Sequence, residues 1–490
     1  MFLLGPEVLR SLGRLARLGV AASVLGSILG CGPADSAELK TVAWIVVDTL
    51  RADALGTYGF EELGEAGIPA SPHIDRLAGE GLVFDRAYSA APWTIPSLVT
   101  QLSGTWPFDH GQSRLLEPLD ESLLLLPEVL RESGWRTAGV TTNFIARASY
   151  GFDRGFERFD DGLAKGHLGA YGKLAVERLL AQGDDLLAES GQAGEPGGDL
   201  FLWGLLFEPH YHYEQHPGLG FGPGYGSRSG ESYTGSLNGE EELAALRTGL
   251  REGLLNQADF DFLRGCYQSE VALVDEAIAR LREGLEARGR WDEALVIVTS
   301  DHGELIGENN WIGHTVDLSE TLVRVPLVVK PPASWGLAPR RVPEAVSQVD
   351  LFATVLDAAG IVLPEYSAPT SRSLLPTWQA GEQPSRRFLY LHTDFIPIRE
   401  GEEFSSKRAL QFGVFDRERD LKWVVDHLAT TPEGEALVRG ELTRMESGEK
   451  QEFVGERLPL EFADLERLRG LLAEPLGEAR GAERLEPEQP

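Results

Sequence analysis

Apolar residues follow two alternating patterns along the chain: short continuous runs and longer repeats with helical spacing. Four runs end at polar turns, and they cover 41–48 (TVAWIVVD), 200–210 (LFLWGLLFEPH), 294–304 (ALVIVTSDHGE) and 325–329 (VPLVV). Continuous apolar runs bounded by polar turns are typical of strands buried on both faces of a sheet. The pattern therefore predicts four buried strands.

Helical spacing separates these runs. It covers residues 71–84, 123–134 and 267–289, and in the last segment apolar residues recur three or four apart before Gly289. A glycine at this point is a common helix end. Strands that alternate with helices predict an α/β domain with a mainly parallel sheet flanked by helices.

Acids and histidines follow three of the predicted strands: Asp48, then Glu208 and His210, then Asp301 and His302. Open α/β sheets bind ligands at the carboxyl ends of their strands. One such residue is a common start of a loop, but three strand ends together favour a functional site.

Residues 89–104 (SAAPWTIPSLVTQLSG) predict a helix that ends at Gly104, with Thr94 at the N-cap position. Threonine is a good cap because its hydroxyl accepts a hydrogen bond from a free N–H of the first turn. The local pattern leaves open whether Thr94 caps the helix or carries chemistry.

The C-terminal part has a different pattern of apolar and polar residues. Residues 386–394 and 410–428 predict strands of a smaller sheet, and 462–474 predicts a late helix. We expect a catalytic domain over 41–380, an α+β subdomain over 381–475 and a disordered tail over 476–490. Residues 189–199 read as a surface linker, and the Gly- and Tyr-rich segment 216–239 reads as a substrate-side loop.

The N-terminus carries an export pattern. Arg10, Arg14 and Arg17 precede the apolar run 18–30 and then Cys31. This order predicts a signal peptide over 1–30 and a linker over 31–40. The letters ILGC resemble a bacterial lipoprotein cleavage box with Cys31 as the acylated residue, which implies an exported lipoprotein of the cell envelope, in the periplasm or outer membrane. An ordinary signal peptide and an uncleaved anchor are the alternatives.

The net charge of the chain argues against some classes of function. The chain has 45 Lys and Arg against 76 Asp and Glu, a net charge of −31, and two cysteines. This excess of acid argues against nucleic-acid binding, which depends on basic patches. An anionic substrate would meet an unfavourable long-range field, so a local cation, such as a metal ion, must offset it.

An ordered set of motifs resembles the sulfatase family of the alkaline-phosphatase-like superfamily. The motifs are VVDTLRADALGTYG, SPHIDRLAGEGLVFDRAYS, APWTIPS, GFDRGFERFDD, FEPHYHY, VTSDHGELIGE, IGH and RVPLVVKPP. The resemblance implies an alkaline-phosphatase-like α/β fold with a smaller C-terminal α+β subdomain. It implies metal ligands at Asp48, Asp301, His302 and Thr94. It also implies that Thr94 is the nucleophile and that His210 and His314 contact the ester or protonate the leaving oxygen.

The sequence departs from the family at the nucleophile. Sulfatases convert Cys or Ser of a C-x-P-S-R pattern to formylglycine, but here Thr94 and Leu98 occupy the first and last positions. Formylglycine is therefore not expected. Phosphoesterase relatives use threonine with two metals, and the candidates for a second site are Glu208, His210 and His314. The histidines favour zinc or manganese over calcium.

Three functions remain open from the sequence. The first is a metal-dependent sulfatase-family hydrolase of an anionic small-molecule or glycan ester. The second is a phosphodiesterase or phosphonate-type hydrolase that uses Thr94 as nucleophile. The third is a non-catalytic glycan-binding protein of the cell surface. In each case we expect membrane contact only through the lipid anchor.

Overall fold

The computed structural model describes most of the chain between residues 39 and 455. The described ranges are 39–60, 70–164, 171–189, 198–213, 216, 240–362, 370–386, 388–395, 409–418, 420–430, 436–445 and 447–455. The predicted signal peptide, Cys31, most of the linker, nearly all of the 216–239 loop, the 462–474 helix and the tail lie outside them. Among the described residues, no helix combines the length and the apolar character needed to cross a membrane.

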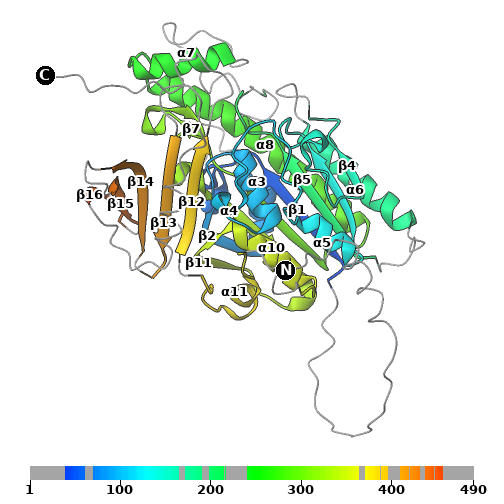
Figure 1. Cartoon of the computed structure of the whole chain (residues 1–490). Coiled ribbons are helices and arrows are strands. Elements are labelled where there is room, and N and C mark those ends of the chain that lie inside the picture. Colours follow the sequence, from blue (N-terminus) through cyan, green and yellow to red (C-terminus); the bar gives the residue numbers. More distant parts are fainter. Residues whose placement is uncertain are drawn as a thin grey trace, which may run out of the picture. The chain divides into compact units, whose positions relative to one another are not determined.

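A large mixed sheet organises the described chain (Figure 1). Its order is β11-β2-β10-β6-β1-β5-β3-β4, with β9 paired to β2. The strands are β1 (Thr41–Val47), β2 (Leu82–Tyr88), β3 (Arg136–Thr141), β4 (Arg158–Asp160), β5 (Leu200–Leu206), β6 (Ala294–Ser300), β9 (Arg324–Val325), β10 (Leu327–Lys330) and β11 (Arg340–Ser347). The predicted buried strands β1, β5 and β6 form its centre and run parallel, which confirms the α/β prediction.

The register of the central strands places their ends at one level. Val47 pairs with Leu206 on one side and with Ser300 on the other. Asp48 and Asp301 therefore leave the sheet side by side. This is the edge at which parallel α/β sheets bind ligands.

The 325–329 run differs from the prediction. Pro326 separates β9 from β10, and β10 runs antiparallel to β6 and to β2. Proline has no N–H to donate to a ladder, so it interrupts a strand at this point. An apolar run gives no information about strand direction, which is why the sequence did not reveal this reversal.

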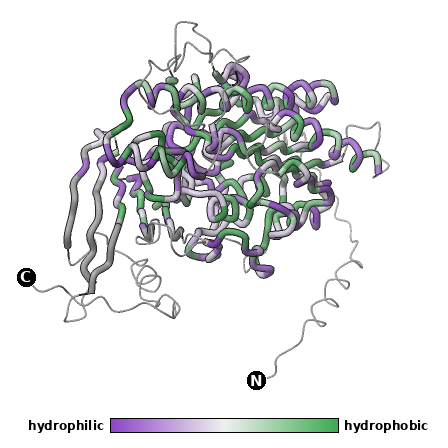
Figure 2. The backbone as a smooth tube through the Cα atoms, turned by 90° about the horizontal axis from the view of Figure 1, so that it is seen from above, coloured by the Kyte–Doolittle hydropathy of each residue, from purple (hydrophilic) through white to green (hydrophobic). Residues whose placement is uncertain are grey.

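Helices cover both faces of the large sheet. Ala43, Ile45 and Val47 belong to a core that includes α2 (Pro72–Gly79), α6 (Gly172–Glu189) and α8 (Gln257–Ala287). Val42, Trp44 and Val46 belong to the core under α3 (Thr94–Ser103), α5 (Leu126–Glu132) and α10 (Leu351–Ala358). Successive residues of a strand face opposite sides, so β1 is buried on both. Figure 2 shows the apolar segments in the interior of this part.

Two predicted helices have other bounds. The 71–84 pattern contains α2, which ends at Gly79, and the first residues of β2. The 267–289 pattern is the second part of α8, which begins at Gln257 after its N-cap Asn256. The remaining helices are α4 (Pro107–His110), α7 (Glu240–Arg251), α9 (Glu320–Val323) and α11 (Leu375–Ala380), with 3-10 turns at Ala52–Ala54, Gly56–Tyr58, Ala148–Tyr150, Glu308–Asn310, Ala333–Trp335 and Gln348–Asp350.

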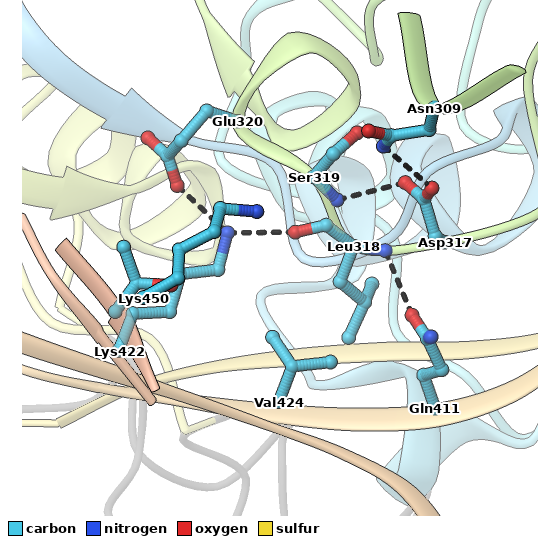
Figure 3. Close-up of a pocket in the computed structure, with 10 residues that line it drawn as sticks. Asn309, Asp317, Leu318, Ser319, Glu320, Gln411, Lys422, Val424 and Lys450 are labelled. Atoms are coloured by element: carbon cyan, nitrogen blue, oxygen red, sulfur yellow. Dashed lines mark hydrogen bonds and ion pairs between the residues drawn. The ribbon is translucent and has the colours of Figure 1, made fainter. Parts of the chain in front are cut away.

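A smaller antiparallel sheet follows, as predicted. It contains β12 (Phe388–Phe395), β13 (Ala409–Asp416), β14 (Leu421–Thr430), β15 (Ala436–Arg444) and β16 (Glu449–Gly455) in chain order. It contacts the segment 317–320 through a polar pocket (Figure 3). There Lys422 Nζ donates to the Leu318 carbonyl at 2.6 Å, and Gln411 Oε1 accepts from Leu318 N at 2.9 Å.

Candidate metal and nucleophile site

Three buried side chains meet at the carboxyl ends of the central strands. Asp48 follows β1, and Asp301 and His302 follow β6; all three are 0% exposed. One ligand atom from each lies within 4.8 Å of the others. The structure therefore brings together three of the residues that the strand-end pattern predicted.

Each carboxylate is held through one oxygen only. Asn143 Nδ2 donates to Asp48 Oδ2 at 2.5 Å. The backbone N–H groups of Thr49 and His302 donate to Asp301 Oδ1 at 3.1 and 2.8 Å. The other oxygens, Asp48 Oδ1 and Asp301 Oδ2, are buried and accept no hydrogen bond from the described residues. They lie 3.6 and 3.4 Å from His302 Nε2.

The imidazole of His302 is fixed by its own backbone neighbour. Its Nδ1 lies 2.9 Å from the carbonyl oxygen of Gly303, which can only accept. Nδ1 therefore carries the proton, and the lone pair of Nε2 points at the two carboxylates. This tautomer and this orientation are typical of a metal-ligating histidine.

Thr94 lies one position later than the sequence predicted. Trp93 is the N-cap of α3, and Thr94 is the first helical residue. The Thr94 hydroxyl makes no cap bond; its Oγ1 lies 3.3 Å from His302 Nε2. Ser97, on the next turn of α3, donates to the Asp301 carbonyl at 2.6 Å and ties the helix start to the site. The cap prediction is wrong, and the hydroxyl faces the candidate metal ligands.

His314 and His210 continue the site away from His302. The ring centroids of His302 and His314 are 4.5 Å apart, and those of His314 and His210 are 4.9 Å apart. His210 also stacks on Phe207 at 4.5 Å. The rings of both predicted histidines therefore form a row that begins at His302, although they come from different loops.

Burial controls the charge of this cluster. It raises the pKa of Asp48 and raises the pKa of Asp301 to about 7. It lowers the pKa of His302, and it lowers the pKa of His210 and of His314 to about 3. Without a counter-charge, the carboxylates are therefore disfavoured and the imidazoles are neutral.

The donor set fits a divalent cation. Two carboxylate oxygens without hydrogen bonds, an imidazole lone pair and a hydroxyl converge in a buried space. A cation there would pair with both unbonded oxygens and reverse the cost of burying the two acids. The imidazole is a ligand that zinc and manganese accept more readily than calcium does.

Glu208 serves a different contact in the structure. Its Oε1 accepts from the backbone N of Tyr171 and Gly172, at 2.6 and 3.4 Å, where α6 begins. Within the described residues, Asp48, Asp301 and His302 are the group compact enough to share one ion. A second metal held by Glu208, His210 and His314 stays a prediction.

Two further polar residues belong to the site. Asn143 follows β3 and holds Asp48. Glu304 is fully buried, and its Oε1 lies 3.0 Å from His314 Nδ1. Asn143 carries the same strand-end signal as Asp48, and Glu304 ends the DHGE run. Neither residue can be told from an ordinary loop residue by local pattern, because only tertiary packing selects its partner.

Comparison with known proteins identifies the family of the chain. The Sulfatase family model matches residues 40–361. The chain is 25% identical over 418 residues to a multifunctional alkaline phosphatase superfamily protein of Trinickia caryophylli, with 73% of this chain and 80% of the relative covered. It is 22% identical to an N-acetylglucosamine-6-O-sulfatase of Bacteroides thetaiotaomicron, with 81% of each covered.

A solved structure shows the same fold. The phosphonate monoester hydrolase of Agrobacterium radiobacter superposes with a TM-score of 0.59 at 21% identity, covering 84% of this chain and 90% of that one. By name, the two relatives and the Agrobacterium enzyme are hydrolases or members of the alkaline phosphatase superfamily. The match to the Sulfatase family model spans more than half of the sequence. The chain belongs to the sulfatase family.

Proposed function

We propose that this chain hydrolyses an anionic sulfate or phosphonate-type ester, with Thr94 as nucleophile and one divalent cation held by Asp48, Asp301 and His302. One observation carries the proposal: the Thr94 hydroxyl faces the His302 lone pair beside two buried carboxylate oxygens that accept no hydrogen bond from the described residues. A site built only for stability would satisfy those oxygens, because unpaired buried polar atoms are costly.

The residues support a two-step displacement. A neutral neighbouring imidazole, His210 or His314, takes the proton of Thr94 Oγ as this oxygen attacks the sulfur or phosphorus, and hands it to the leaving oxygen as the bond to that oxygen breaks. Water then attacks the threonine ester; the imidazole takes a proton from the water and passes it to Thr94 Oγ as the ester bond breaks. Free N–H groups at the start of α3 favour negative charge on the transferring group. A bound divalent cation supplies positive charge to the substrate and lowers the pKa of a nearby hydroxyl.

The relatives suggest two substrate classes. One is a sulfated amino sugar, after the N-acetylglucosamine-6-O-sulfatase. The other is a phosphonate monoester or phosphodiester. Thr94 favours this second class, since a threonine hydroxyl replaces the formylglycine precursor of sulfatases. Leu98, which stands in place of the arginine of the C-x-P-S-R pattern, also departs from the sulfatase pattern. The substrate panel below tests both classes.

The test combines metal content with a substrate panel. Purified full-length protein is loaded with calcium, manganese or zinc and assayed on an aryl sulfate, a bis-aryl phosphate and an aryl phosphonate monoester. We expect turnover on one class that Thr94→Ala abolishes and Thr94→Ser retains in part. Thr100→Ala is the matched control, because it removes a buried hydroxyl of the same helix that contacts His110.

The outcomes separate the alternatives. Unchanged turnover in Thr94→Ala would exclude Thr94 as nucleophile. Two metals per chain would favour the phosphodiesterase alternative. Protein that binds metal and sulfated glycan but cleaves none of the three substrates would be the non-catalytic binding protein.

The cellular location is a separate part of the proposal. Cys31, after the apolar run 18–30, is the proposed site of lipid attachment in the cell envelope. Labelling with a fatty-acid analogue in the native host should mark the wild-type chain and not Cys31→Ser. Equal labelling of both would place no lipid on Cys31.

A further inference from the structure

His314 lies at the end of a short hairpin that cannot fix its ring alone. The hairpin consists of β7 (Leu305–Ile306) and β8 (Ile312–Gly313), which pair at two positions, and His314 is the next residue. Two-stranded ribbons of this length are marginal without other packing. Contacts from outside the hairpin must therefore decide where the imidazole points.

The α7 helix supplies such a contact through Arg247. Its Nε donates to the Ile312 carbonyl at 2.7 Å, and its guanidinium lies 4.4 Å from the centre of the Trp311 ring. Gly313 has a φ of 104°, and a Cβ there would lie 2.5 Å from Arg247 Nη2. Arg247 therefore packs against the three residues before His314, in space that only a glycine leaves open.

Glu304 holds the same histidine from the inner side. Its Oε1 lies 3.0 Å from His314 Nδ1. With the carboxylate as acceptor, Nδ1 carries the proton and Nε2 keeps a free lone pair, in a ring whose centre lies 4.5 Å from that of His302. One contact sets the tautomer of the ring, and the other fixes the backbone from which the ring projects.

We propose that Arg247 is a positioning residue for His314, acting on the β8 backbone so that the imidazole reaches the leaving oxygen. The inference rests on the proposed function, because it assigns proton transfer to His314. A planar guanidinium suits the role: its Nε–H bonds a carbonyl in a fixed direction while the flat group lies over an indole, a geometry that the flexible point charge of a lysine does not reproduce.

The experiment compares esters with good and poor leaving groups in metal-loaded, full-length protein. Proton transfer to the leaving oxygen contributes roughly 10²–10⁴-fold when the leaving group is poor and little when it is good. Arg247→Met should lower kcat on the poor leaving group by about ten-fold or more and leave kcat on a nitrophenyl ester within a few-fold. Arg247→Lys should resemble Arg247→Met. Arg251→Met, an exposed arginine of the same helix that contacts Thr248, should change neither.

Two results would overturn the inference. An equal loss on both esters, with a lower Tm, would make Arg247 structural only. A rise in KM that Arg247→Lys repairs would mean that its charge attracts the substrate directly.

A second readout does not need turnover. Histidine labelled with ¹⁵N reports the tautomer of His314, assigned through His314→Gln. We expect the His314 signal to change in Arg247→Met and to stay unchanged in Arg251→Met. A changed signal in protein that cleaves no ester would reject the proposed function and keep the positioning contact; an unchanged signal would reject the contact.

Discussion

At the scale of single residues, the site is defined by an imbalance of hydrogen bonds. Asn143 binds one oxygen of Asp48, and two backbone N–H groups bind one oxygen of Asp301. The opposite oxygens stay open toward His302. The bonded oxygens orient the carboxylates, and the open ones are left for a cation. The residues around the ligands therefore matter for affinity as well as the ligands themselves.

Asn143→Ala tests whether the hydrogen-bonded oxygen of Asp48 orients the carboxylate for the cation. The change removes the donor to Asp48 Oδ2, so the carboxylate can rotate away from the cluster. Outer-shell losses of this kind cost about 10–100-fold in metal affinity. Competition with a metal-buffering chelator measures the affinity, with Gln257→Ala as control because it removes an exposed amide bonded to Asp261. Wild-type affinity in Asn143→Ala would show that Asp48 needs no such support.

The sequence pattern predicted which strand-end residues meet at the site, but it did not predict the residues that join the site from other elements. Asp48, Asp301 and His302 converge because strand ends share one edge, a rule that the apolar runs reveal. Glu304 and Arg247 act through partners that tertiary packing alone selects. Thr94 was misplaced by one position, since a helix boundary read from letters carries that uncertainty.

At the scale of elements, the α8 helix fixes the start of α2. Asp275 accepts hydrogen bonds from the backbone N of His73 and Ile74, at 3.0 and 2.7 Å. The 71–84 pattern contained the helix and the strand after it, and Gly79–Gly81 is where they part. Which acid of a distant helix would cap α2 could not be read from local sequence, because the pair is 201 residues apart.

This cap predicts a pH-dependent variant. Burial outweighs the hydrogen bonds and raises the pKa of Asp275 to about 7. The unfolded pKa is about 3.9, so the folded state holds the proton more tightly and loses stability as the pH rises from about 4 to 7. The Asp275→Asn variant cannot titrate at this position. Its free energy of unfolding should therefore increase relative to that of the wild type, by up to about 2 kcal/mol, between pH 5 and pH 8. Urea unfolding at both pH values measures it; a constant difference would contradict the shift.

At the scale of the whole molecule, the ion would join distant parts of the chain. Asp48 and Asp301 lie 253 residues apart, and Thr94 comes from a third element. The unfolded chain has no such site, so binding free energy adds to folding free energy. The N-terminal prediction, by contrast, rests on residues outside the described structure, and its support remains the sequence pattern.

Metal addition should therefore stabilise the folded chain. At 100 times the Kd, binding to the folded state contributes about 2.7 kcal/mol. We expect the Tm of chelator-treated protein to rise with added manganese or zinc, and the rise to be absent in Asp301→Asn, which keeps the side-chain shape. Differential scanning calorimetry gives both values. An equal rise in the variant would place the ion elsewhere.

The net charge of −31 predicts how salt affects the reaction. An anionic ester approaching this protein is repelled at long range and attracted close to the metal. The Debye length falls from about 30 Å at 0.01 M salt to about 8 Å at 0.15 M. Over that range sodium chloride should screen the distant acids more than the buried site, so kcat/KM should rise, and more for a doubly charged ester than for a singly charged one. The kcat at saturating substrate should stay constant, because it does not depend on the encounter of substrate and protein. A fall in kcat/KM would mean that the local cations control encounter despite the charge of the whole chain.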